Sequence, residues 1–149
     1  MKRPWAALCL VLALSVFMPQ ASEAQTQSIG ERQRKPGMTL GQNYPNPFNP
    51  ETKIPFSVGD PPTCPDQGKQ HRVTLKIYNL LQQPVAIPVL QGGNNAGQPL
   101  QNLSLRCGEY IAYWDGKMIG TGREAASGVY LFRLEVDGRP LVVKGFSVK

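Results

Sequence analysis

Few side chains in this 149-residue sequence are of a type and spacing that could carry out catalysis. The single histidine, His71, precedes Arg72 at the start of an expected strand, where a histidine is usually solvated rather than catalytic. A serine nucleophile with its histidine and acid has no support, because Ser127 lacks the Gly-x-Ser-x-Gly turn that exposes such a serine. The sequence therefore indicates a protein that is not an enzyme.

The acidic side chains give little support for a metal centre. Asp60 and Asp66 lie in one proline-rich loop, where a calcium site is conceivable, but no calcium-loop pattern accompanies them. Cys64 and Cys107, with the distant His71, do not complete the four ligands of a tetrahedral zinc site. We expect neither a metal nor any other cofactor.

A disulfide is the covalent chemistry that the cysteines favour. Of the three cysteines, Cys9 lies in an expected leader, which leaves the pair Cys64 and Cys107. An even number of cysteines in an exported chain favours a bridge, and closing a loop of about 44 residues would stabilise the fold by about 4 kcal/mol. Two free, buried thiols are the alternative.

The start of the chain has the pattern of a secretory signal peptide, residues 1–24. Lys2 and Arg3 form a basic start, an apolar run follows, and Ala24 is the small residue before an expected cut ahead of Gln25. A membrane anchor is the alternative, but the run of 14 apolar residues spans only about 21 Å as a helix, less than the roughly 30 Å of a bilayer core. We expect export and no integral membrane span.

The charge balance is basic but not concentrated. The formal net charge of the sequence is +6, and its lysines and arginines are scattered, with only Arg32, Arg34 and Lys35 close together. A mild excess of this kind suits acidic surfaces or polysaccharides weakly. This scattered charge argues against a nucleic-acid partner, because nucleic-acid-binding proteins concentrate their lysine and arginine side chains on one face.

The rest of the sequence divides into a short lead and one domain. Residues 25–39 are polar and show no period, which predicts a flexible linker. The remaining stretch, 40–149, has a length that suits a single domain.

Short strands with a period of two recur along this domain. In the segment 129–136 apolar and polar side chains alternate, and the pair Asp137-Gly138 that follows favours a type I′ turn into a returning strand. Pro55 and Pro88 are expected to mark edge strands. Without a helical period, the pattern predicts an all-β fold, an Ig-like antiparallel β-sandwich of about seven strands. The expected strands are 52–58, 72–79, 84–90, 100–105, 109–114, 129–136 and 141–148.

The stretch before the first of these strands, residues 40–50, predicts a stiff and irregular arch. Its three prolines lock φ, and its asparagines can bond nearby backbone. Tyr44 and Phe48 are expected to plug one end of the core. A proline-rich docking ligand is the alternative, but the arch contains no PxxP repeat.

The loop after the strand 109–114 has its own expected structure. Trp114 is large and apolar and should anchor the core. Asp115 can accept hydrogen bonds from backbone N–H groups two or three residues on, and Gly116 permits a left-handed turn. Ligand binding by this loop is the alternative.

These motifs together resemble one known family. In order along the sequence they look like the type A C-terminal sorting domain of the type IX secretion system, which is similar in fold to the Ig-like domain of the flagellar hook-capping protein. The resemblance covers 40–149. The motif residues are Tyr44, Pro45, Asn46, Pro47, Phe48, Asn49, Pro50, Trp114, Asp115, Gly116, Ser127, Gly128, Val129 and Tyr130.

The resemblance implies a role in secretion. Members of the family follow exported cargo through the Sec pathway of a Gram-negative bacterium and are read by an outer-membrane translocon or bound by cell-surface components. The protein would then be found in the periplasm, at the cell surface or outside the cell. A free-standing secreted structural or binding module of the same fold is the alternative. The residues that the translocon would recognise lie in the last hairpin: Leu141, Val142, Val143, Lys144, Phe146, Val148 and Lys149.

Overall fold

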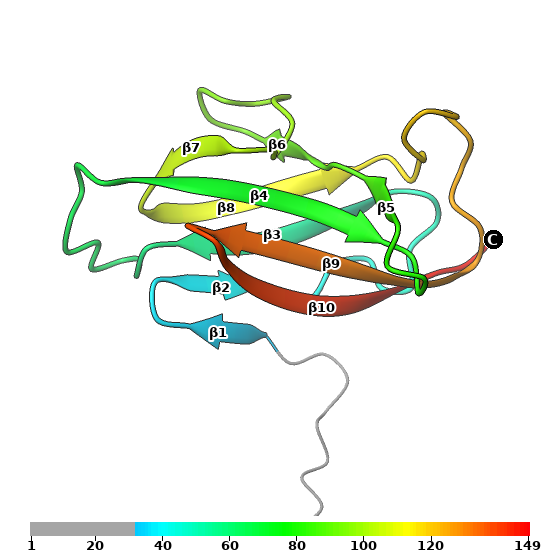
Figure 1. The fold of residues 1–149 in the computed structure, drawn as a ribbon, viewed down its shortest axis with the longest axis horizontal. Coiled ribbons are helices and arrows are strands. Elements are labelled where there is room, and N and C mark those ends of the chain that lie inside the picture. The colour runs from blue at the N-terminus through cyan, green and yellow to red at the C-terminus, as the bar shows by residue number, and fades with distance from the viewer. Residues whose placement is uncertain (1–31) are drawn as a thin grey trace, which may run out of the picture.

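The computed structural model describes residues 32–149, which contain ten β-strands and no helix (Figure 1). No helix in this part could therefore cross a membrane. The expected signal peptide, with Ala24 and Gln25 at its cut, lies outside the described residues. The strands are β1 (Gln33–Lys35), β2 (Met38–Leu40), β3 (Thr52–Val58), β4 (Gln70–Tyr78), β5 (Pro84–Ala86), β6 (Val89–Gln91), β7 (Leu103–Arg106), β8 (Gly108–Trp114), β9 (Gly128–Val136) and β10 (Arg139–Ser147).

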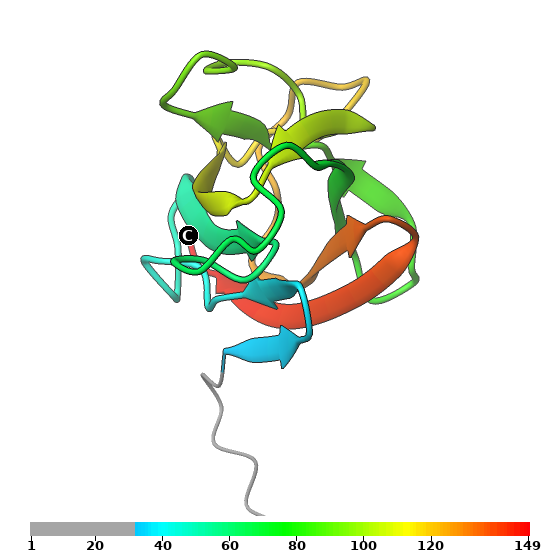
Figure 2. The ribbon, with the colours of Figure 1, turned by 90° about the vertical axis from the view of Figure 1, so that its left-hand side faces the viewer.

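The strands form two sheets that face one another (Figure 2). The sheet named A here has the order β1-β2-β3-β8-β6, and the sheet named B has the order β10-β9-β4-β5, with β7 also paired to β4. All these pairs are antiparallel. The predicted all-β sandwich is confirmed, with ten strands instead of about seven.

One additional pair of strands lies where a flexible linker was expected. The segment from Gln33 to Leu40 forms the β1–β2 hairpin, and its turn includes Gly37 at a positive φ of 80°. Met38 and Leu40 point into the core and are fully buried. The linker prediction is therefore wrong for this segment, because three-residue strands are too short to show a period of two.

A second difference concerns the strand expected at 84–90, which divides into β5 and β6. β5 pairs with β4 in sheet B, whereas β6 pairs with β8 in sheet A. Pro88 stands between the two strands, where its fixed φ and missing N–H interrupt a ladder. The chain therefore crosses from one sheet to the other here. The edge position expected for this stretch is found for both of its parts, since β5 ends the order of sheet B and β6 ends that of sheet A.

A third difference concerns β3, which was expected at an edge and lies between β2 and β8. Pro55 pairs with Ile111 of β8, and its carbonyl accepts a hydrogen bond from the N–H of Gly41 at 2.8 Å. In an antiparallel ladder the N and C=O of one residue point to the same neighbour. The missing N–H of Pro55 therefore faces the position just beyond the end of β2, where it breaks no ladder bond.

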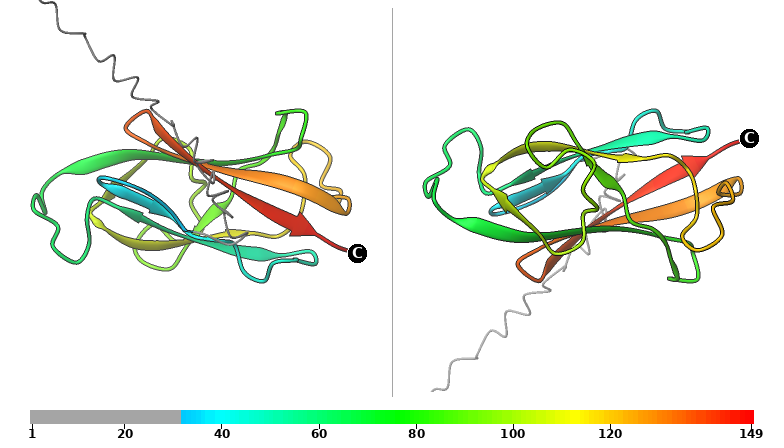
Figure 3. Two further views of the ribbon diagram at one scale, coloured as in Figure 1. Left: turned by 90° about the horizontal axis from the view of Figure 1, so that it is seen from below. Right: turned by 90° about the horizontal axis from the view of Figure 1, so that it is seen from above.

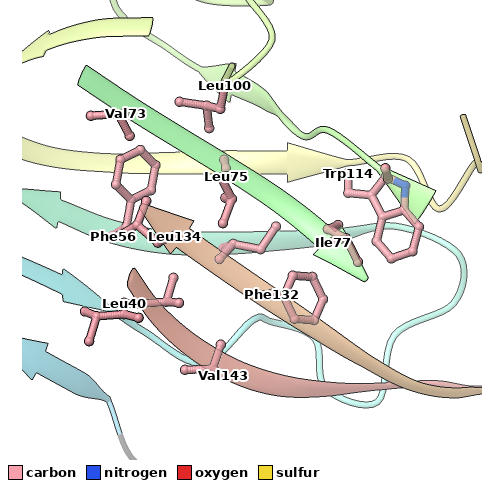
Figure 4. Packing of buried hydrophobic residues seen from close by; sticks show 14 of the residues in the cluster. Leu40, Phe56, Val73, Leu75, Ile77, Leu100, Trp114, Phe132, Leu134 and Val143 are labelled. Atoms are coloured by element: carbon pink, nitrogen blue, oxygen red, sulfur yellow. The ribbon is translucent and has the colours of Figure 1, made fainter. Parts of the chain in front are cut away.

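The core lies between the two sheets and follows the predicted alternation (Figure 4). In β9 the side chains of Phe132, Leu134 and Val136 are fully buried. Asp137 and Gly138 then turn the chain with φ values of 50° and 79°, as the type I′ turn requires. The last hairpin, β9–β10, is thus built as the sequence predicts and contributes one inner face to the core.

Candidate recognition site

The proline-rich arch lies against the end of β10. The N–H of Phe48 donates to the carbonyl of Phe146 at 2.8 Å, and the N–H of Val148 donates to the carbonyl of Phe48 at 3.0 Å. The side chain of Asn46 accepts a hydrogen bond from the N–H of Phe146 at 2.9 Å. Both views of Figure 3 show the chain end at the same end of the molecule as the arch. The arch therefore takes the place of a further strand beside the end of β10.

Phe48 also closes this end of the core. Its ring is 1% exposed, and its centroid lies 5.4 Å from that of Trp114 and 6.1 Å from that of Tyr130. Tyr44 was expected beside it, but 45% of this residue is exposed. The arch thus inserts one aromatic side chain instead of two, because Asn43 occupies the buried position next to Tyr44 and bonds Thr52 at 2.9 Å.

The Trp-Asp-Gly loop has the structure that the sequence predicts and also touches the arch. Trp114 is 3% exposed, and Asp115 accepts a hydrogen bond from the N–H of Lys117 at 2.9 Å. Gly116 has a positive φ of 78°, and a Cβ at this position would overlap the carbonyl oxygen of Pro50. The loop and the arch therefore pack so closely that glycine is required where they meet.

The Ser-Gly-Val-Tyr motif supplies the third part of this contact. Tyr130 is 7% exposed, stacks edge-on against Trp114 at 5.6 Å, and donates its hydroxyl to the carbonyl of Ala126 at 2.9 Å. Ser127 and Gly128 are exposed. The three motifs that are far apart in the sequence therefore meet in one aromatic cluster beside the end of β10.

The residues expected to be recognised in β10 divide between the two faces of the strand. Leu141 and Val143 are buried in the core at 4% and 5% exposure. Val142, Lys144 and Phe146 alternate with them and point outward. Past the strand, Val148 is 46% exposed and Lys149 lies 3.6 Å from Glu124. The buried residues of the set are out of reach of a partner while the domain is folded.

The outer edge of β10 is covered by side chains that sequence analysis did not identify. Gln33 accepts a hydrogen bond from the N–H of Val142 at 3.2 Å, and Gln42 donates one to the carbonyl of Lys144 at 2.6 Å. Polar side chains that bond an edge strand protect it from pairing with another chain. Their role depends on a contact between two ends of the chain, so no local pattern marks it.

His71 is another residue whose surroundings differ from those expected. It is 8% exposed, and its Nδ1–H donates to Asp137 at 2.7 Å. Asp137 also accepts a hydrogen bond from the N–H of Arg72 at 2.9 Å. The pair fastens the β9–β10 turn to the start of β4, so His71 is a structural residue of the last hairpin and not a solvated one.

This contact predicts an acid-sensitive turn. Burial would raise the pKa of Asp137, but hydrogen bonds from His71 and the Arg72 N–H outweigh burial and lower that pKa below its ordinary value. A lowered pKa adds stability above the unfolded-state pKa, and that stability is lost as the pH falls through the folded-state pKa. The free energy of unfolding should therefore decrease as the pH falls below about 4.

Urea unfolding at a series of pH values measures this effect, with Asp137→Asn as the comparison. Asparagine tolerates the positive φ of this position, so the turn is kept while the titrating group is removed. Because 38% of the Asp137 side chain is exposed, the acid-dependent difference should be below about 1 kcal/mol. Equal pH dependence in the two proteins would contradict the assignment.

The predicted disulfide is confirmed. Cys64 in the β3–β4 loop and Cys107 between β7 and β8 are bonded, with their Cα atoms 5.7 Å apart. The bridge joins the long β3–β4 loop to the connection between β7 and β8. It therefore closes the end of the molecule opposite the arch.

An open hollow of about 770 Å³ lies beside the loop that follows β6. Its lining is mixed, with the amides of Asn94 and Asn95 and the charged groups of Arg106 and Glu109 beside apolar side chains such as Ile111. Within residues 32–149, no group of three or more His, Cys, Asp or Glu side chains is placed to hold a metal ion.

The fold and the site define a disulfide-linked antiparallel β-sandwich whose last strand is held by a proline-rich arch. Comparison with protein-family models, with curated proteins and with solved structures finds no match to this chain. The family resemblance of the sequence motifs therefore stays a prediction.

Proposed function

We propose that the chain is an exported, non-catalytic recognition module. An outer-membrane translocon of the type IX secretion class would read its last hairpin, after export through the Sec pathway of a Gram-negative bacterium, and deliver it to or anchor it at the cell surface. The observation that supports this function is the meeting of the three resemblance motifs beside β10. Phe48, Trp114 and Tyr130 pack together there, and the backbone of Phe48 bonds that of Phe146.

The geometry supports recognition in a second way. Binding costs less conformational entropy when the strand that is bound is already held in one conformation. β10 is paired along its length with β9, and its outer edge is bonded by the arch and by Gln33 and Gln42. The domain therefore offers the outward side chains of this strand in a fixed arrangement.

A free-standing secreted binding module is the second candidate. The observation that favours it is the open hollow beside the loop after β6, where Gln91, Asn94, Asn95, Arg106 and Glu109 offer hydrogen-bonding groups. Such groups could hold a polar ligand without any role in secretion.

A reporter fusion tests the proposed function against this candidate. Residues 25–149 are placed after a signal peptide and a secreted reporter enzyme, in a bacterium with the type IX translocon and in a mutant without it. The sorting function predicts reporter activity accessible on intact cells only when the translocon is present. Reporter confined to the periplasm of both strains would contradict it and favour the binding module.

A further inference from the structure

The structure limits how a partner could contact β10. One side of the strand faces the core, since Leu141 and Val143 are buried. One edge is paired with β9, and on the other the Val142 N–H, the Lys144 carbonyl and both backbone groups of Phe146 are already bonded. An added partner strand needs free edge groups. The outward face of the strand is therefore the part that a partner can reach.

This outward face continues across β9 and β4, as the register of sheet B shows. Val142 of β10 lies opposite Arg133 of β9, and Arg133 in turn lies opposite Lys76 of β4. Residues directly opposite one another in a sheet point to the same face. Within residues 32–149, neither sheet A nor any other strand covers this side of sheet B (Figure 2).

The next two rows of the same face are mainly apolar. Tyr78, Leu131 and Lys144 lie opposite one another across the three strands, and Val129 lies opposite Phe146. The four apolar side chains are each only partly buried. The outward face of β10 thus lies beside a strip of aromatic and aliphatic side chains.

Positive charge lies beside this strip. Lys76 stands directly opposite Arg133, although like charges in such a cross-strand pair destabilise a sheet. Arg133 contacts Glu135 at 3.3 Å, but neither Lys76 nor Lys144 has an ion-pair partner in the described part of the chain. The face therefore carries an excess of positive charge that the domain itself does not balance.

We propose that the outward face of β4, β9 and β10 is the docking surface for an acidic protein partner. The strip Tyr78, Leu131, Val129 and Phe146 supplies the apolar contact, and Lys76, Arg133 and Lys144 pair with carboxylates of the partner. Complementary charge steers such an encounter and selects the partner, while the buried apolar contact holds it. The inference rests on the proposed function, since the partner is the translocon component that reads the last hairpin.

The reporter fusion with Lys76→Glu tests this surface. The substitution reverses one charge of the face, yet it places an acid opposite Arg133, so the sheet should keep or gain stability. Reporter on the cell surface should fall by about tenfold, because like charges brought together in an interface oppose docking. Thermal unfolding of the purified variant, with a melting temperature equal to or above that of the wild type, shows that the fold is intact.

Lys53→Glu is the matched control. Lys53 is exposed on β3 of sheet A, where it lies opposite Tyr113 and has no ion-pair partner within residues 32–149. The substitution Lys53→Glu makes the same change of charge as Lys76→Glu, but on sheet A. It should leave delivery of the reporter to the cell surface unchanged. If both variants lost the same amount of surface reporter, the positive net charge of the domain would be attracted to an anionic polymer or membrane without regard to the face that carries it. That result would overturn the proposal.

The outcomes separate the two proposals. If the wild-type fusion reaches the surface and Lys76→Glu does so equally well, the docking face is wrong and the sorting function stands. If the wild-type fusion never reaches the surface in the strain with the translocon, the sorting function fails and the docking proposal fails with it.

Discussion

Replacing Phe48 with alanine should lower the free energy of unfolding by about 3–5 kcal/mol, the range for removing a buried phenylalanine from a packed core. The ring is 1% exposed and contacts Trp114, Tyr130 and Phe132, with centroids 5.4, 6.1 and 6.3 Å away. These neighbours belong to β8 and β9 and are held by their own ladders. They cannot move together to fill the space, so a cavity remains.

Urea unfolding of the purified domain measures this loss. Tyr44→Ala is the matched control, because Tyr44 lies in the same arch but is 45% exposed. The control should change the free energy of unfolding by less than about 1 kcal/mol. Equal effects of the two substitutions would show that the arch is not anchored by Phe48.

Removing the disulfide should have an effect of similar size. Cys64 and Cys107 are 43 residues apart in the sequence, and opening a loop of this length costs about 4 kcal/mol in the chain-entropy model. In this chain-entropy model the bridge acts mainly by restricting the unfolded chain. The double substitution Cys64→Ser and Cys107→Ser should therefore unfold at a markedly lower urea concentration.

Reduction of the wild-type protein is the control for this substitution. If the bridge is responsible, wild type under reducing conditions and the double variant under either condition should unfold at nearly the same urea concentration. A difference below about 1 kcal/mol between oxidised and reduced wild type would contradict the prediction.

The sequence predicts the longer strands of the sandwich well. The strand expected at 52–58 has the bounds observed for β3, and the strand expected at 129–136 differs from β9 by one residue. Over seven to nine residues, one buried face and one exposed face give a clear period of two. The Asp137-Gly138 turn was equally predictable, because few residue pairs accept positive φ at both positions.

The bounds of the short elements could not be found in this way. β1, β2, β5 and β6 have three residues each, too few for a period to be distinguished from chance. Pro55 and Pro88 were both interpreted as marks of an edge. Pro55 lies in an inner strand, beside the end of its neighbour β2, whereas Pro88 lies at the crossing between two strands that are both at a sheet edge. Proline always lacks a backbone N–H donor, but the tertiary arrangement decides where that lack is tolerated.

The candidate site was predicted only in part, for a similar reason. Phe48, Trp114 and Asp115 have the roles that local sequence gives them. The bonds of Gln33 and Gln42 to β10 join residues 109 and 102 positions apart, and the His71–Asp137 contact joins residues 66 apart. Contacts of this kind depend on the register of the whole sandwich, which no single stretch of sequence contains.

All of the proposals depend on β10 being held on both sides, and amide hydrogen exchange of the full chain measures this directly. The amides of Phe146 and Val148 bond the arch, so their exchange should be slowed by about a thousandfold or more, as for amides released only by global opening. The amides of the exposed Gly92 and Asn94 serve as the unprotected reference. Exchange of Phe146 and Val148 as fast as this reference would contradict the account.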